Sequence, residues 1–309
     1  MIKRNLIIIT IALSLLLSCG SKKSDIVLDT HRDIKAYNMR GNELYWKGDY
    51  TGAAKAYNRA YLLSIKIDNR HGISESLNNL GQLYIVAKDF SAAKEKFDQA
   101  YKISKESSDS KEMAATLFNL GSLELKMGNN KKAEEFLEEA LNLYKGLKDK
   151  IGIATATNNL GLVAFNQNDD DLAYSNYLSA LDTAKEIKLH QLAATIYQNI
   201  GKLFEKKNDL GNAIFNYNQA LKEDKLVEYS IGIATDLENL GVVYKKSGDL
   251  QSSADYYKRA YNIYTEMGLQ NMMINNLKNL ISVEQALGDK ESAKKHTEEL
   301  KNLNSSTSI

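Results

Sequence analysis

The chain has 309 residues, which is enough for two ordinary domains or for one elongated repeat protein. Its net charge of +1 provides no strongly basic face, so the composition argues against a nucleic-acid partner. Proline is absent from the whole sequence, and since proline commonly interrupts helices, its absence favours long continuous ones.

The first eighteen residues have the pattern of a secretory signal peptide. Lys3 and Arg4 precede an apolar run, Leu6 to Leu17, that is too short to favour a membrane-spanning helix. The sequence LLSCG at 16–20 then resembles the lipobox of bacterial lipoproteins. That resemblance implies lipidation at Cys19 and a membrane-anchored protein of the bacterial cell envelope, in the outer membrane and periplasm or on the cell surface. A soluble secretory signal, or an ordinary unpaired thiol at Cys19, is the alternative.

Cys19 is the only cysteine, so a disulfide within the chain and a cysteine-rich metal site are both excluded. Cleavage before Cys19 removes two of the 40 basic residues and leaves 38 against 39 acidic ones. We expect residues 19–32 to form the lipidated cysteine and a tether.

A spacing of 40 residues runs through the rest of the sequence. Six glycines and one isoleucine mark it: Gly41, Gly81, Gly121, Gly161, Gly201, Gly241 and Ile281. Twelve residues after each mark comes a small residue: Ala53, Ala93, Ala133, Ala173, Ala213, Ser253 and Ala293. Four further on comes a larger one in six of the seven cases: Tyr57, Phe97, Leu137, Tyr177, Tyr217 and Tyr257, with Thr297 last. A period of this length predicts a helical solenoid, in which small residues allow close helix approach and large residues fill the spaces.

A turn is predicted seven residues after each mark. The residues there are Gly48, Lys88, Gly128, Asn168, Asn208, Gly248 and Gly288, and an Asp or Asn follows each. Gly and Asn tolerate the left-handed conformation that ends a helix, and the next Asp or Asn can cap the following helix. Only Lys88 departs from this turn chemistry.

A second alanine follows three residues after each of the first six larger residues, at Ala60, Ala100, Ala140, Ala180, Ala220 and Ala260. This order of glycine, alanine, aromatic residue and alanine resembles the tetratricopeptide repeat (TPR) family over residues 33–303. The resemblance implies an all-α fold, an α-α superhelix or TPR solenoid of about seven helix-turn-helix repeats. The expected repeats are 33–68, 69–108, 109–148, 149–188, 189–228, 229–268 and 269–303, before a disordered tail at 304–309. The period of 40, longer than the usual 34, is similar to that of Pins-type and kinesin light-chain scaffolds.

No constellation of catalytic or metal-binding residues is apparent. The histidines His31, His71, His190 and His296 lack the spacing of a zinc site, and the glycines never cluster into a phosphate-binding loop. We therefore predict a protein that is not an enzyme and that has no cofactor or metal.

Asparagine recurs at one position in six repeats, and we call these residues the asparagine row: Asn79, Asn119, Asn159, Asn199, Asn239 and Asn279. Because asparagine is a mediocre helix former, six at one mid-helix position need an explanation. In peptide-binding members of the family, the matching position faces the concave groove. The resemblance thus implies partner binding through these amides. The alternative is that they hydrogen-bond to neighbouring repeats and only hold the stack together.

Other positions expected on the same face vary along the chain. Tyr45 and Trp46 predict an apolar, aromatic N-terminal end, whereas four lysines make the later part basic: Lys126, Lys202, Lys206 and Lys246. A protein or peptide partner that is acidic where it meets these lysines would suit them, although ordinary solvated lysines are an equal alternative.

We therefore predict a lipid-anchored TPR scaffold that binds a peptide or protein segment in its concave groove. The alternative is a small-ligand carrier or sensor accessory protein of an envelope transport or signalling system.

Overall fold

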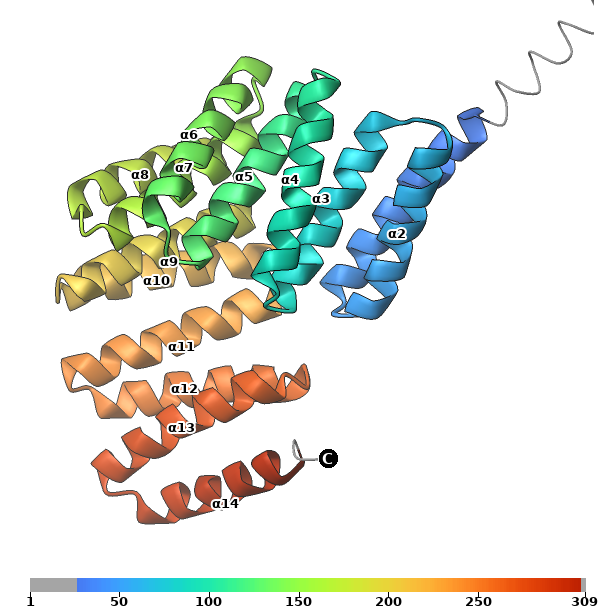
Figure 1. The fold of residues 1–309 in the computed structure, drawn as a ribbon. Helices are drawn as coiled ribbons and strands as arrows, with labels where there is room; N and C mark the ends of the chain where they lie inside the picture. The colour runs from blue at the N-terminus through green and yellow to red at the C-terminus, as the bar shows by residue number, and fades with distance from the viewer. Residues whose placement is uncertain (1–26, 307–309) are drawn as a thin grey trace, which may run out of the picture. The chain divides into compact units, whose positions relative to one another are not determined.

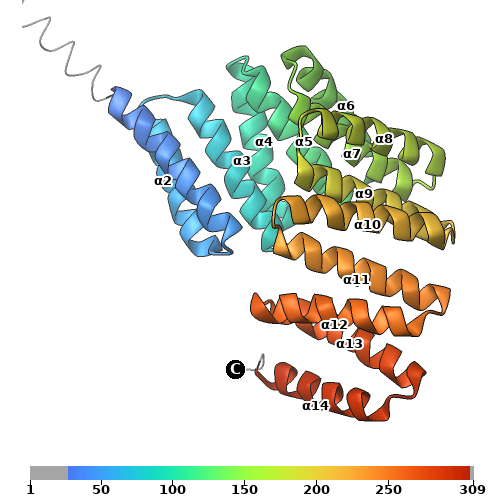
Figure 2. The same cartoon turned by 180° about the vertical axis from the view of Figure 1, so that it is seen from behind.

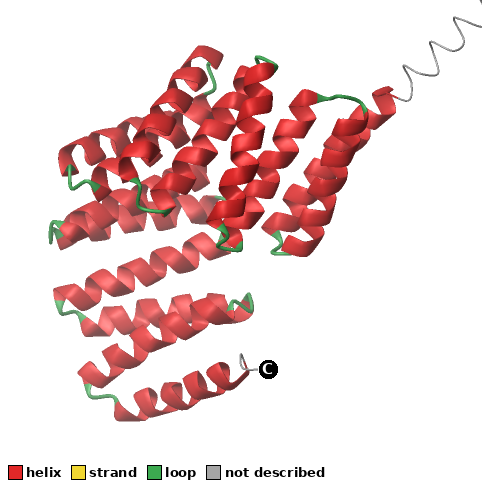
Figure 3. Cartoon of the chain, in the orientation of Figure 1, coloured by secondary structure: helices red, strands yellow, loops and turns green. Residues whose placement is uncertain are grey.

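The computed structural model describes residues 27–306, and this part of the chain is helical without any strand (Figure 3). A helix at residues 27–46 comes first. It is followed by α2 (Tyr50–Lys66), α3 (Arg70–Val86), α4 (Phe90–Glu106), α5 (Ser110–Lys126), α6 (Asn130–Leu147), α7 (Lys150–Asn166), α8 (Asp170–Glu186), α9 (His190–Lys206), α10 (Leu210–Leu226), α11 (Ser230–Ser247), α12 (Leu250–Glu266), α13 (Gln270–Leu287) and α14 (Lys290–Ser306) (Figures 1 and 2). The helices come in pairs, a first and a second helix for each 40-residue repeat, which confirms the predicted fold class.

The two ends of the helical array extend beyond the predicted repeats. Residues 27–32, assigned to a tether from the sequence, are helical, because Thr30 and Ile34 are buried one turn apart and continue the packed face of the helix. At the other end α14 runs to Ser306, into the predicted tail. Leu303 packs against the core, and its carbonyl oxygen accepts a hydrogen bond from Gln270. The predicted signal peptide, Cys19, and residues 307–309 lie outside the described residues.

The contacts divide the chain into two compact units, Met1–Lys148 and Asp149–Ile309. In the described part of the first unit the first helices are the 27–46 helix, α3 and α5; in the second unit they are α7, α9, α11 and α13. Over residues 27–306 no helix is both long and apolar enough to cross a membrane.

The 40-residue marks are places where two helices of one repeat come close together. A Cβ added to Gly201 would lie 2.7 Å from the ring of Tyr217, and one added to Gly81 would lie 2.4 Å from that of Phe97. Tyr217 and Phe97 are fully buried. The glycine of each first helix thus leaves the room that the large residue of the second helix fills, as the spacing predicted. The last repeat reverses the sizes, with Ile281 at the glycine position and Thr297 at the aromatic one.

The turns within repeats have the predicted left-handed residue, and Lys88 adopts it as well, with φ of 60°. The sequence did not reveal that the turns between repeats use the same conformation. Their residues have φ between 51° and 67°: Asp68, Ser108, Lys148, Lys188, Glu228 and Gly268. Only one of these six is a glycine, so the left-handed geometry is set by the helix packing on both sides rather than by local preference.

The predicted helix caps form in six of the seven repeats. The side-chain oxygen accepts from the backbone N–H three residues on, at 2.8 to 3.1 Å, for Asp49, Asp89, Asp169, Asp209, Asp249 and Asp289. The prediction is wrong for Asn129. Its Nδ2 instead donates to Oε2 of Glu124 at 2.8 Å, because that buried carboxylate needs hydrogen-bond donors.

The first helices line the inner side of each unit. In the first unit α3 packs directly on α5, and in the second unit α9 packs on both α7 and α11. Among the described second helices, no two consecutive ones make a comparable contact. Since elements on the inside of a curved stack approach each other more closely, the first helices form the concave side, where the asparagine row was predicted.

Candidate functional site

The asparagine row lies on the first helices, but its members do two different things. Three of them, Asn119, Asn199 and Asn279, hydrogen-bond to the preceding repeat. Asn119 Nδ2 donates to Asn78 Oδ1 at 3.4 Å, and Asn199 Nδ2 donates to Asn158 Oδ1 at 2.9 Å. Asn279 hydrogen-bonds to the carboxylate of Glu238, in the matching place. For these three asparagines the contacts favour the stacking role that the sequence had left open.

The other three members of the row differ in how far their amides are used by hydrogen bonds within the array. The amides of Asn79 and Asn239 make no hydrogen bond within residues 27–306, and the Nδ2 atom of each is buried without a partner. Asn159 accepts a hydrogen bond from Asn158 Nδ2 at 3.4 Å. A buried amide group without a partner costs free energy, so Asn79 and Asn239 are the row members that stacking does not explain.

Asn79 lines a pocket of about 340 Å³ between the 27–46 helix, α2 and α3. We call it the aromatic pocket, and its lining residues are Asn42, Tyr45, Trp46, Tyr57, Asn79 and Gln82. Three of the residues predicted from the sequence, Tyr45, Trp46 and Asn79, are thus brought together in one place.

The aromatic rings at this pocket pack against one another. Tyr45 meets Trp46 edge to face at 5.7 Å between ring centroids, and it meets Tyr50 at 5.6 Å. Trp46 nevertheless remains 80% exposed, which is unusual for the largest apolar side chain. Burial raises the pKa of Tyr45, and burial, with Tyr45 and Glu75 nearby, raises the pKa of Tyr57 to about 12. Both hydroxyls are therefore uncharged at neutral pH, and no residue lining the pocket carries a charge.

Sequence reasoning missed three residues of the pocket. Asn42 and Gln82 lie three residues after the row position of their helices, so helical spacing could have placed them on the same face. Tyr57 was assigned to the core, and its ring is buried. Its hydroxyl nevertheless reaches the pocket, where it donates to Asn42 Oδ1 at 2.8 Å.

The predicted basic region is weaker than the lysine count suggests. Lys206 Nζ lies 2.8 Å from Asp170 Oδ1, and Lys246 Nζ lies 2.7 Å from Glu205 Oε1. These ion pairs within the array neutralise two of the four lysines, and the cationic group of Lys206 also lies over the ring of Phe165.

Lys126 and Lys202 are exposed and form no ion pair within residues 27–306. They belong to different compact units. Each of these two lysines therefore keeps its positive charge for an acidic partner.

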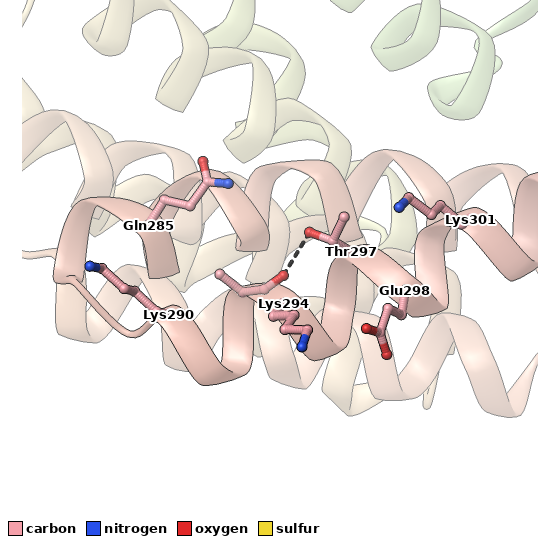
Figure 4. A pocket seen from close by; sticks show the side chains of 7 residues that line it. Gln285, Lys290, Lys294, Thr297, Glu298 and Lys301 are labelled. Atoms are coloured by element: carbon pink, nitrogen blue, oxygen red, sulfur yellow. Dashed lines mark hydrogen bonds between the residues drawn. The ribbon is translucent and has the colours of Figure 1, made fainter.

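A second depression, of about 380 Å³, lies between α13 and α14 (Figure 4). Lys290, Lys294 and Lys301 line it, but their ammonium groups lie at separate places along α14 (Figure 4). Thr297 Oγ1, which also lines it, donates to the backbone oxygen of Ala293 at 2.6 Å. Without converging polar groups, this depression is a weaker binding candidate than the aromatic pocket.

The histidines do not come together either. His31 pairs with Asn69, His71 with Asp109, His190 with Glu223 and His296 with Glu284. In the described part of the chain, no group of three or more His, Cys, Asp or Glu side chains could hold a metal ion.

Comparisons with known proteins agree with this architecture. A family model described as tetratricopeptide repeat matches residues 33–106, 97–146 and 152–222, and a second with the same description matches residues 237–270. A comparison with curated protein sequences found no match.

Several solved structures are similar in fold. BtubC (BKLC) from P. vanneervenii has 24% identity and a TM-score of 0.57, over 77% of this chain and 92% of that chain. A Rap protein in complex with Competence and Sporulation Factor has 18% identity and a TM-score of 0.67, over 92% and 80%. A signal transduction ATPase (STAND) protein with a tetratricopeptide repeat sensor, from Pyrococcus horikoshii, has 15% identity and a TM-score of 0.72, over 91% of this chain but 42% of its own.

Proposed function

Because the chain belongs to the tetratricopeptide repeat family, we propose that it is a scaffold that binds a segment of a partner protein on the face formed by its first helices. The observation that carries this proposal is the aromatic pocket on that face, with an exposed Trp46 and the unsatisfied amide of Asn79. Tryptophan and tyrosine are enriched among the residues that anchor protein interfaces. The similar Rap protein, which was solved in complex with a factor, supports the same kind of role.

We further propose that the scaffold is held at the bacterial cell envelope through a lipid on Cys19. The support is the signal-like N-terminus and the lipobox-like sequence at 16–20. In a fractionation experiment, the wild-type chain is expected with the membranes and Cys19→Ala in the soluble fraction. Membrane association of Cys19→Ala that detergent still releases would overturn the lipid anchor.

The binding proposal is tested by capture of partners from solubilised membranes. The double variant Asn79→Ala with Asn239→Ala removes the two row amides that stacking does not use, and it is expected to lose the partner while its helical circular dichroism persists. The matched control is Asn58→Ala with Asn218→Ala, because these two exposed amides lie on second helices. Equal capture by both double variants would overturn the role of the row.

The alternative function, a small-ligand carrier, makes a different prediction. It requires a ligand-dependent rise in the thermal midpoint of the purified chain without any other protein. A scaffold instead requires a stoichiometric protein partner, so the two experiments distinguish the two functions.

A further inference from the structure

The polar groups at the aromatic pocket are fixed in a particular order by hydrogen bonds within the array. Tyr57 donates its hydroxyl hydrogen to Asn42 Oδ1 at 2.8 Å, so the oxygen of the Asn42 amide is occupied. The Nδ2 group of Asn42 is then the end of the amide that is left to donate. Asn42 is exposed, so this donor is open to a ligand.

Gln82 is fixed in the opposite sense. Its Nε2 donates to Asn119 Oδ1 at 2.7 Å, which leaves its Oε1 as an acceptor. The Asn79 amide, which lines the same pocket, makes no hydrogen bond within residues 27–306, and its Nδ2 is the buried end, so its Oδ1 is a second available acceptor. The rim of the pocket therefore offers a donor from the 27–46 helix and acceptors from α3.

A peptide unit has the complementary groups, since its C=O accepts and its N–H donates. Bonds from Asn42 Nδ2 to a carbonyl oxygen and from a main-chain N–H to Gln82 Oε1 would use both fixed ends. The aromatic walls from Tyr45 and Trp46, with no charged residue lining the pocket, suit an uncharged apolar side chain next to that peptide unit.

We propose that the aromatic pocket binds an apolar or aromatic side chain of an extended peptide, with the neighbouring main-chain groups held by Asn42 and Gln82. The ligand is uncharged at this place, unlike the acidic segment that the lysine pattern suggested. This inference rests on the proposed function and specifies the residue class that the partner presents to the first two repeats.

The test uses the single tryptophan of the chain, Trp46, as a fluorescent probe located in the pocket itself. The full chain is held in lipid nanodiscs and titrated with acetylated, amidated pentapeptides. Each peptide has a central phenylalanine, leucine, aspartate or lysine flanked by glycine and serine. We expect a saturable change in Trp46 emission with the phenylalanine and leucine peptides, and at least a tenfold weaker response with the charged ones. Equal responses to all four peptides, or no response to any, would overturn the proposal.

Two variants examine the hydrogen bonds. Asn42→Asp keeps an oxygen that accepts from Tyr57 but removes the donor, so affinity for the phenylalanine peptide is expected to fall at least fivefold. Gln82→Ala is expected to weaken binding similarly, and its thermal midpoint separates this effect from loss of the bond to Asn119. The control is Phe215→Ala, because Phe215 is an exposed aromatic residue on α10, outside the pocket. Unchanged affinity in Asn42→Asp overturns the peptide-unit geometry.

A small molecule is distinguished by a probe that has the ring but no peptide unit. If benzyl alcohol changes Trp46 emission as strongly as the phenylalanine peptide, and Asn42→Asp does not affect binding of the peptide, the pocket is a small-ligand site and our inference is wrong.

Failure of the scaffold function gives a different result. In that case the peptides still bind at Trp46, but no stoichiometric partner is captured from membranes. If a partner is captured equally by the wild type and by Trp46→Ala, the scaffold function stands and the pocket is not its contact.

Discussion

Asn199 Nδ2 donates a hydrogen bond to Asn158 Oδ1 at 2.9 Å, and so joins the first helix of one repeat to that of the repeat before it. Asn119 makes the same bond to Asn78, and Asn279 bonds to Glu238. These hydrogen bonds link the second repeat to the third, the fourth to the fifth, and the sixth to the seventh. The row therefore alternates along the chain, which matches the recurrence of the sequence NNLG after eighty residues.

The alternation predicts opposite effects of the same substitution at two row positions. Asn199→Ala leaves the Oδ1 atom of the buried Asn158 without its donor and should lower the free energy of unfolding by about 1–3 kcal/mol. Asn239→Ala removes a buried amide group that has no hydrogen bond and introduces a better helix former, so it should raise the free energy of unfolding by about 0.5–1 kcal/mol. Urea unfolding followed by circular dichroism compares the two. Equal losses would show that the Asn199 bond contributes nothing.

The close approach at Gly201 predicts a packing penalty. A methyl group there would lie 2.7 Å from the buried ring of Tyr217, so Gly201→Ala should destabilise the protein by about 1–3 kcal/mol. Gly146 is the control, because it lies inside α6 and an added Cβ would meet no atom within 4 Å beyond its chain neighbours and the backbone of its own helix. Gly146→Ala should stabilise the protein by about 0.5–1 kcal/mol through helix propensity alone. A gain of stability at both sites in thermal unfolding would contradict the packing account.

The left-handed turn at Lys88 predicts that a glycine at this position stabilises the protein. Lys88 is exposed and has φ of 60°, so Lys88→Gly removes the steric cost of a side chain in that region. The expected gain is about 1 kcal/mol in urea unfolding. Lys102→Gly, at an exposed position inside α4, should instead cost about 0.5–1 kcal/mol. If both changes destabilise equally, the turn is not strained by its lysine.

Two buried carboxyl groups predict a dependence of stability on pH. Burial raises the pKa of Asp236 to about 8 and that of Asp224, its hydrogen-bonding neighbour on α10, to about 6. The folded protein therefore keeps a proton on Asp236 that the unfolded chain, with a pKa near 4, releases. The contribution of this proton to stability is therefore full below about pH 4 and falls as the pH rises towards about 8.

Asp236→Asn should remove most of this pH dependence and raise the free energy of unfolding at pH 8 by at least about 1 kcal/mol. An asparagine oxygen can still accept from Gln198, which donates to Asp236 Oδ1 at 2.7 Å. Asn276, forty residues later, occupies the same repeat position fully buried. Urea unfolding at pH 5 and pH 8 measures the effect, with the exposed Asp182→Asn as control. A variant that follows the wild-type pH profile would show that Asp236 is not the responsible group.

The sequence determined the fold because the repeats place small and large residues at the same packing positions. Glycine on one helix and a large residue on the next, sixteen positions on, predict the close approach seen between Gly201 and Tyr217. The Asp residues that follow the turns within repeats predicted six helix caps for the same reason, since a cap is formed by neighbours in sequence. The turns between repeats escaped prediction, because residues such as Glu228 have no local preference for a positive φ.

Only the tertiary structure decided what each predicted site residue does. Sequence spacing gives Asn79 and Asn199 the same position in their repeats. Whether each amide is bonded depends on the neighbouring helix, which offers Asn158 to Asn199 but leaves the Nδ2 atom of Asn79 without a partner. Sequence spacing also gives Lys206 and Trp46 matching places, yet Asp170 neutralises the first, whereas the side chain of the second is 80% exposed. Helix identity follows from local chemistry and periodicity, whereas the availability of a side chain depends on contacts between residues about forty positions apart.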